Sequence, residues 1–195
     1  MDFLQKSSRG ISEVSGSAKL AFDGIIFIRG EITDEAADEF LEQMLLLNGE
    51  NRERPIRVLI NSPGGSVRAA LMMYDAIKGS PAPVQTCCVG NAYSMAAVLL
   101  AAGTGGRYML PHSEAMIHEP GLGSGISGNT SSIRLISESL MEIKNRLGRI
   151  LAADTGRSEQ EIEEALAFDH FFSPQESVKF GLCDKVITFK DILEG

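Results

Sequence analysis

Strand and helix signals alternate three times between Ile25 and Ala102, and this alternation limits the fold more than any other feature of the sequence. The apolar runs Ile25–Ile28, Ile56–Ile60 and Val84–Val89 have the length and composition of buried strands. Each run is followed by a segment in which apolar residues recur at helical spacing. Crossover helices between parallel strands produce this order, so the sequence predicts an α/β fold with a mainly parallel sheet covered by helices.

The helices between these strands are marked by their end signals. Thr33 is suited to cap the first helix, which we expect to end at Asn48-Gly49. Its expected buried face consists of Ala36, Ala37, Phe40, Leu41, Met44 and Leu45. The second helix carries Val67, Ala70, Leu71 and Ile77 and is stopped at Gly79-Ser80-Pro81.

The second half of the chain is organised differently. Short strands are predicted at Arg107–Leu110 and Ala115–Ile117, with a last one at Lys185–Thr188. A long helix is expected from Thr130, after a Gly/Ser-rich run over residues 121–128, and its narrow apolar stripe is typical of a helix packed on another helix. That stripe consists of Ile133, Ile136, Leu140, Ile143, Leu147 and Ile150.

Two capping boxes predict short helices that flank Asp169. They pair Ser158 with Glu161 and Ser173 with Glu176, the second with a proline directly after the serine. Asp169 therefore lies in the connection between two helices.

Length and charge limit the partners and the compartment. The 195 residues suffice for one substantial core, so we expect a mobile arm at residues 1–20 and a single domain at 21–195. A net charge of −8 argues against nucleic-acid binding, and no apolar run approaches the roughly 20 residues that span a membrane.

The N-terminus lacks the pattern of a secretory signal, and the three cysteines fit neither a disulfide framework nor a metal site. We expect a cytoplasmic protein without a metal.

A serine stands where a predicted strand meets a predicted helix. In the pentapeptide Ala92-Tyr93-Ser94-Met95-Ala96, the chain turns through Gly90 and Asn91 and continues as a helix over residues 95–102. A serine at a helix start most often caps the backbone, but the same position also favours a developing negative charge. Alanines replace both glycines of the G-x-S-x-G hydrolase motif. Ser94 is thus a candidate nucleophile or a cap.

Further residues along the chain supply the other parts of a serine hydrolase site. The segment Asn61-Ser62-Pro63-Gly64-Gly65 is either an ordinary loop or a source of outward-facing backbone N–H groups that can form half of an oxyanion hole. His118 ends a predicted strand and is a candidate base. A purely structural role is also possible for His118, as it is for His112 and His170. Glu119 and Asp169 can each orient a base, and Asp169 is the better candidate because neighbours on a strand point to opposite faces.

Many of these stretches together resemble the proteolytic subunit of the Clp protease, over about residues 22–188. The matching stretches are Ile25-Ile26-Phe27-Ile28 with Gly30, Ile60 through Val67, Gly90 through Met95, Leu110-Pro111, Met116-Ile117-His118-Glu119-Pro120, and Phe172-Ser173 to Gly181-Leu182. The resemblance implies the fold shared by Clp peptidases and crotonases, with a protruding helical handle at residues 121–155.

The resemblance also implies the activity and the partners. Ser94 would be the nucleophile, His118 its base and Asp169 the residue that orients the base, while the backbone N–H groups of Gly65 and Met95 would form the oxyanion hole. The chain would be a serine endopeptidase subunit. It would assemble into two stacked seven-membered rings, homomeric or mixed, that cleave unfolded proteins. An ATP-driven AAA+ unfoldase would feed the chamber, so ATP would belong to the partner and this chain would need no cofactor.

The chain departs from the family pattern near the nucleophile and near Asp169. Tyr93 and Ala96 stand where the family commonly has alanine and glycine, and Ala167-Phe168 replace an Asp-Arg pair. In the handle, Gly128-Asn129-Thr130 replaces Gly-Gln-Ala. These differences indicate a divergent paralogue. Two other functions stay open: a weakly active or inactive ring subunit that partners another isoform, and a crotonase-like acyl-CoA enzyme.

Overall fold

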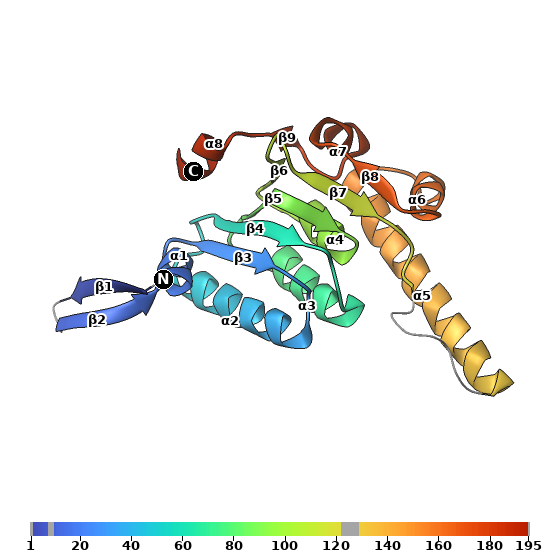
Figure 1. The fold of residues 1–195 in the computed structure, drawn as a ribbon, viewed down its shortest axis with the longest axis horizontal. Helices are drawn as coiled ribbons and strands as arrows, with labels where there is room; N and C mark the ends of the chain where they lie inside the picture. The colour runs from blue at the N-terminus through green and yellow to red at the C-terminus, as the bar shows by residue number, and fades with distance from the viewer. Residues whose placement is uncertain (1, 8–9, 122–128, 195) are drawn as a thin grey trace.

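The computed structural model describes residues 2–7, 10–121 and 129–194, and their main feature is a twisted, mostly parallel sheet (Figure 1). Its strand order is β3 (Ile25–Arg29), β4 (Ile56–Ser62), β5 (Val84–Tyr93), β6 (Gly106–Met109) and β9 (Lys185–Val186), all paired in parallel. Two further strands extend it beside the end of β5: β7 (Glu114–Ile117) pairs parallel with β5, and β8 (His170–Phe172) pairs antiparallel with β7. The predicted α/β fold class is confirmed.

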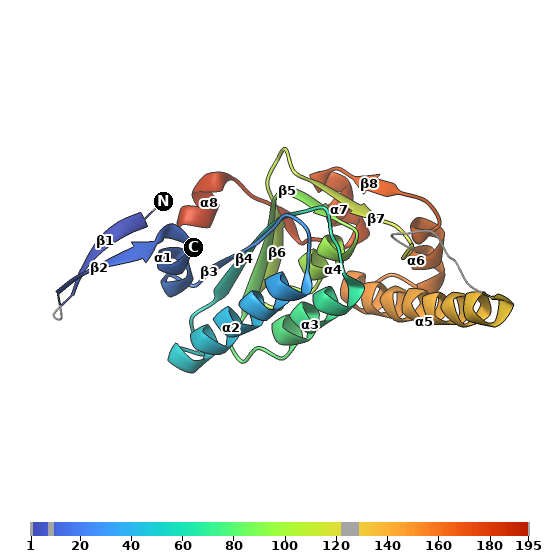
Figure 2. The ribbon, with the colours of Figure 1, turned by 60° about the horizontal axis from the view of Figure 1, so that its bottom comes forward.

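Helices α2 (Asp34–Glu50), α3 (Val67–Lys78) and α4 (Met95–Ala101) cover one face of this sheet (Figure 2). Thr33 caps α2 as expected, through a hydrogen bond from the Ala36 backbone N–H. The helix continues to Glu50, however, and Leu45 is 67% exposed, so its assignment to the buried face was wrong. Leu47 takes the place next to the core, because the buried side chains follow the spacing 37, 40, 44 and 47.

Every residue of α4 is buried, since this short helix passes through the centre of the core. Its alanines at positions 96, 97 and 101 allow it to pack closely against the neighbouring elements. The central position of α4 matters for function because Ser94 directly precedes it.

The Gly90-Asn91 pair forms a β-bulge, which corrects the expectation of a turn there. Strand β5 runs on to Tyr93, and its register against β4 shifts from the pair Ile60/Cys88 to the pair Ser62/Ala92. The Asn61 side chain fills the bulge: its Oδ1 accepts a hydrogen bond from the Asn91 N–H at 3.1 Å. A Cβ at position 90 would lie 2.4 Å from the same oxygen, so any other residue there would have to displace the Asn61 amide.

Helix α5 (Thr130–Thr155) packs on the domain through its C-terminal half only (Figure 1). Leu147 and Leu151 are buried, whereas Ile133 near the start of the helix is 42% exposed. The first half of the apolar stripe therefore projects from the domain. The two predicted capping boxes are confirmed at the starts of α6 (Glu159–Leu166) and α7 (Pro174–Phe180).

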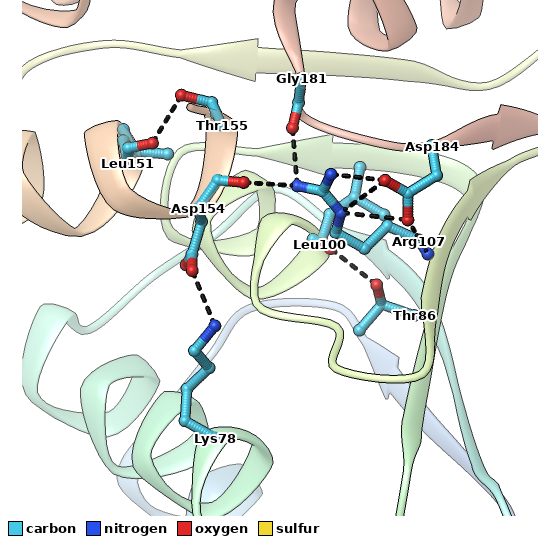
Figure 3. A network of polar contacts seen from close by, with 9 residues as sticks. All are labelled: Lys78, Thr86, Leu100, Arg107, Leu151, Asp154, Thr155, Gly181 and Asp184. Carbon is cyan, nitrogen blue, oxygen red and sulfur yellow. Dashed lines mark hydrogen bonds and ion pairs between the residues drawn. The ribbon is translucent and has the colours of Figure 1, made fainter. Parts of the chain in front are cut away.

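A polar network holds the base of α5 against the sheet (Figure 3). The Arg107 guanidinium on β6 donates to the backbone carbonyls of Asp154 and Gly181, each at 2.7 Å, and pairs with the Asp184 carboxylate. Lys78 on α3 pairs with the Asp154 carboxylate at 2.7 Å. Because these groups come from distant parts of the chain, the network fixes where the buried half of α5 lies.

Five of the described elements were not predicted from the sequence pattern, and one of them is β8 in the connection that follows Asp169. Strands β1 (Asp2–Ser7) and β2 (Gly10–Ser15) form an antiparallel hairpin, followed by α1 (Gly16–Phe22), within the segment expected to be an arm. Helix α8 (Phe189–Glu194) follows the last strand. The expected glycine-rich start of the handle falls on residues 122–128, which lie outside the described residues.

Candidate active site

Ser94 occupies a strained turn between β5 and α4. Its backbone φ of 55° and ψ of −124° are unfavourable for a residue with a side chain, and no other described non-glycine residue has a positive φ. The Ser94 N–H donates to the Met116 carbonyl on β7 at 2.8 Å, which ties the turn to the neighbouring strand. The sharp turn directs the hydroxyl out of the helix start, as in a nucleophile elbow.

The Ser94 hydroxyl does not cap α4, although the residue stands at the cap position. Within the described residues, the Ser94 side chain accepts no hydrogen bond from a backbone N–H group of α4. Its Oγ instead lies 2.9 Å from Nε2 of His118. The alternative interpretation of Ser94 as a helix cap is therefore wrong.

His118 lies between Ser94 and Asp169, with Nδ1 at 3.0 Å from Oδ1 of Asp169. An ionised carboxylate can only accept a hydrogen bond, so Nδ1 carries the proton and donates it. In that tautomer, Nε2 can accept a hydrogen bond from the Ser94 hydroxyl. This is the arrangement in which a histidine can act as a general base towards a serine.

Strand pairing explains how three residues that are far apart in sequence meet. Ser94 follows β5, His118 follows β7 and Asp169 precedes β8, and β7 pairs with both of the other strands. The Asp169 side chain is 62% exposed and the His118 side chain 34%. The cluster thus opens to the protein surface.

The Gly64-Gly65 segment lies directly against the Ser94 turn. A Cβ at Gly64, whose φ is +93°, would lie 2.8 Å from the Ser94 Cβ and 3.2 Å from the Met95 nitrogen. A Cβ at Gly65 would lie 2.3 Å from the Ile32 carbonyl oxygen. Ile32 holds the segment through two backbone hydrogen bonds of 2.8 Å, one to the Gly64 carbonyl and one from the Ser66 N–H. Because of this close packing, neither position has room for a side chain larger than the hydrogen atom of glycine.

The other candidate residues lie elsewhere. Glu119 pairs with Lys144 of α5 at 2.8 Å, a contact that raises the Lys144 pKa by stabilising the ammonium form. His112 is exposed in its turn, and the His170 ring stacks on Phe172 with 4.2 Å between centroids. No sequence pattern pointed to Lys144 or Ile32 as neighbours of the site, because both act through contacts between distant segments.

An apolar pocket adjoins Ser94 and His118. Side chains from four helices and the β7 connection line it: Val67, Met95, Val98, Pro120, Leu147, Leu151 and Leu166. Leu147 and Leu151 come from the half of α5 that the Arg107 network fixes. Its volume is only about 20 Å³, which is room for about one water molecule, so an apolar side chain could enter beside the serine only if the lining moved.

The described residues hold no cluster suited to metal chemistry and no reactive thiol. No group of three or more His, Cys, Asp or Glu residues within them is arranged for a metal ion. All three cysteines are buried, and desolvation raises the pKa of Cys87 and Cys183 to about 12 and that of Cys88 to about 11. None of the helices in the described ranges has both the length and the hydropathy to cross a bilayer.

Comparison with known proteins identifies similar sequences. Residues 8–190 match the family model described as Clp protease. The ATP-dependent Clp protease proteolytic subunit of Bdellovibrio bacteriovorus is 39% identical over 194 residues, which cover 98% of this chain and 92% of that protein.

Proposed function

This chain belongs to the Clp protease family, and from that premise we propose that it is a serine endopeptidase with Ser94 as its nucleophile. The observation that carries the proposal is the continuous hydrogen-bond chain from the Ser94 hydroxyl through His118 to Asp169, with distances of 2.9 and 3.0 Å. A serine that served the fold alone would cap its helix, and this one does not.

The proposed reaction begins when Ser94 Oγ attacks the carbonyl carbon of a peptide bond. His118 Nε2 takes the hydroxyl proton as the bond forms and then gives it to the leaving amine. Asp169 holds the ring with its protonated Nδ1 turned away from the serine. Water, activated by the same histidine, then releases the second product from the acyl-enzyme.

We assign the oxyanion hole to the backbone N–H groups of Gly65 and Met95. Met95 is the first residue of α4, where N–H groups have no partner within the helix. The closeness of Gly64 to the Met95 nitrogen supports this assignment, since it brings the glycine segment next to the helix start. Two donors on opposite sides of one oxygen would stabilise the tetrahedral intermediate.

A fluorophosphonate probe tests the proposal directly. We expect the probe to react covalently with the native protein at Ser94, and peptide mapping to find the adduct there. The probe does not react with acyl-CoA enzymes that use only backbone amides, nor with a ring subunit that has lost catalysis. A native, assembled protein that stays unlabelled under conditions in which a known serine peptidase reacts would overturn the proposal.

The apolar pocket predicts substrate preference. Peptides with leucine, methionine or phenylalanine before the scissile bond should be cleaved about 10- to 100-fold more efficiently than peptides with aspartate there. Once the lining shifts to admit the side chain, an apolar group gains transfer free energy there, whereas an aspartate loses hydration. Comparing kcat/KM for matched fluorogenic peptides measures this ratio. Equal values for the two classes contradict binding of that side chain in the pocket.

The buried thiols predict resistance to cysteine reagents. Iodoacetamide at neutral pH should leave peptidase activity unchanged, because the raised pKa values keep Cys87, Cys88 and Cys183 protonated and burial excludes the reagent. Mass spectrometry should find all three labelled only after denaturation. Loss of activity together with labelling of a cysteine in the native state would contradict this prediction.

We further propose that the chain assembles into two stacked seven-membered rings, homomeric or with a second isoform, in the cytoplasm. Membership of the family supports this, as does the projecting half of α5 with its exposed Ile133, Leu135 and Met141. The partner would be an AAA+ unfoldase that supplies the ATP-driven step. Particle mass in solution tests the assembly: a monomer that is fully active on peptides argues against a ring requirement.

A further inference from the structure

Tyr93 connects the three strands next to which the candidate catalytic residues lie. It lies on β5 directly before Ser94, and its register partner on β7 is Met116. Met116 is in turn paired with Phe171 on β8. Tyr93, Met116 and Phe171 therefore form one cross-strand row at the edge of the sheet.

The Tyr93 side chain makes a specific contact with each neighbouring strand. Its hydroxyl donates to Oε1 of Glu114 on β7 at 2.5 Å. Its ring meets the Phe171 ring on β8 edge to face, with 5.8 Å between centroids and an interplanar angle of 85°. The hydrogen bond to Glu114 raises the Tyr93 pKa to about 12, so the phenol keeps its proton at neutral pH and remains a donor.

Both contacts lie close to the residues whose spacing matters for the reaction. Phe171 is two residues after Asp169, and β7 leads from Glu114 to His118 within four residues. Strand β8 has only three residues, and Phe171 is 51% exposed. So short a strand has few ladder hydrogen bonds of its own, and contacts such as that of Tyr93 contribute substantially to its position.

From this juxtaposition we propose that Tyr93 is a positioning residue: by joining β5 to β7 and β8, it sets the spacing of Ser94, His118 and Asp169. The inference rests on the proposed peptidase function. The hydrogen bond from Tyr93 to Glu114 holds β7, and with it His118, near the serine. The ring contact with Phe171 keeps Asp169 near the histidine.

Variants that separate the two contacts test the inference. Tyr93→Phe removes the hydroxyl and keeps the ring, Glu114→Ala removes the acceptor, and Phe171→Leu removes the aromatic edge while keeping an apolar side chain. Tyr108→Phe is the matched control, since Tyr108 lies on β6 and packs in the separate small cluster around Leu59, Cys87 and Ile192. The measurements are kcat and KM on a short peptide, the rate of fluorophosphonate labelling, and the midpoint of thermal unfolding.

We expect Tyr93→Phe to lower kcat and the labelling rate about three- to tenfold, with KM changed less than about twofold, because one hydrogen bond that orients the reacting groups is lost. Glu114→Ala should have the same effect, and the double variant should be no worse than either single one. Tyr93→Ala should lower kcat further, while Tyr108→Phe should match the wild type.

The outcomes also separate this inference from the proposed function. If the wild type labels at Ser94 and Tyr93→Phe keeps both its kcat and its labelling rate, the positioning role is wrong and the peptidase assignment stands. If the wild type itself does not label, the peptidase assignment fails. Crystal structures then still decide the positioning role: an unchanged distance between Ser94 Oγ and His118 Nε2 in Tyr93→Phe contradicts it, and a longer one supports it.

Discussion

Replacing Ser94 with alanine is expected to lower peptidase kcat by about 10⁴- to 10⁶-fold, the range found when the nucleophile of a triad is removed. The physical reason is that no other group in the cluster can form the covalent intermediate. His118→Ala should have an effect of similar size, and the Ser94→Ala/His118→Ala double variant should be no less active than either single variant. Such non-additivity is the signature of residues that act as one unit.

The positive φ of Ser94 predicts that two inactive variants differ in stability. Ser94→Gly should be as inactive as the alanine variant, yet more stable than it by roughly 1 kcal/mol, because glycine adopts a positive φ without steric cost. Thermal or denaturant unfolding measures the difference. An alanine variant as stable as the glycine variant would show that the turn stores no strain.

Ser177→Ala is the matched control for the nucleophile. Ser177 is fully buried, and its hydroxyl has no hydrogen-bond partner among the described residues. Removing that hydroxyl should therefore leave kcat unchanged. The assignment of Ser94 is contradicted if Ser94→Ala retains more than a few per cent of wild-type activity in a preparation free of other peptidases.

Adding one methyl group at Gly65 is expected to reduce kcat about 100- to 1000-fold, the effect of losing an oxyanion-hole donor. The Cβ of Gly65→Ala would lie 2.3 Å from the Ile32 carbonyl oxygen and 2.7 Å from the Ile32 nitrogen, and these are backbone atoms that cannot rotate away. The φ of +152° is also unfavourable for alanine. The segment must shift, and the N–H group proposed for the oxyanion moves with it.

Gly148→Ala on α5 is the control for this substitution. A Cβ at Gly148 has no neighbouring atom within 4 Å, and the residue lies inside a helix. We expect unchanged kcat and a gain in stability of about 0.5–1 kcal/mol from the higher helix propensity of alanine. Measuring kcat beside the circular dichroism spectrum separates a lost donor from a lost fold. A folded Gly65→Ala variant with wild-type kcat would remove Gly65 from the proposed oxyanion hole.

The elements that depend on local signals were predicted well. The strands and helices from β3 to α4, the long helix from Thr130 and both capping boxes follow from side-chain periodicity and from hydrogen bonds between residues three apart. The error at Gly90-Asn91 occurred because a distant residue decides the local conformation there. Gly90-Asn91 has the composition of a turn, but Asn61 of the neighbouring strand converts it into a bulge within β5.

Some features of the candidate site could likewise be predicted from the sequence, whereas others depend on the fold. The sequence alone determined the α/β class, the serine at a strand-to-helix junction and, through the resemblance, the choice of His118 and Asp169. Only the tertiary structure decided that the Ser94 hydroxyl contacts His118 rather than its own helix, that Lys144 pairs with Glu119, and that Tyr93 joins three strands. The reason is physical: periodicity and capping involve residues within a few positions, whereas the site is assembled by strand pairing and packing between segments far apart in the chain.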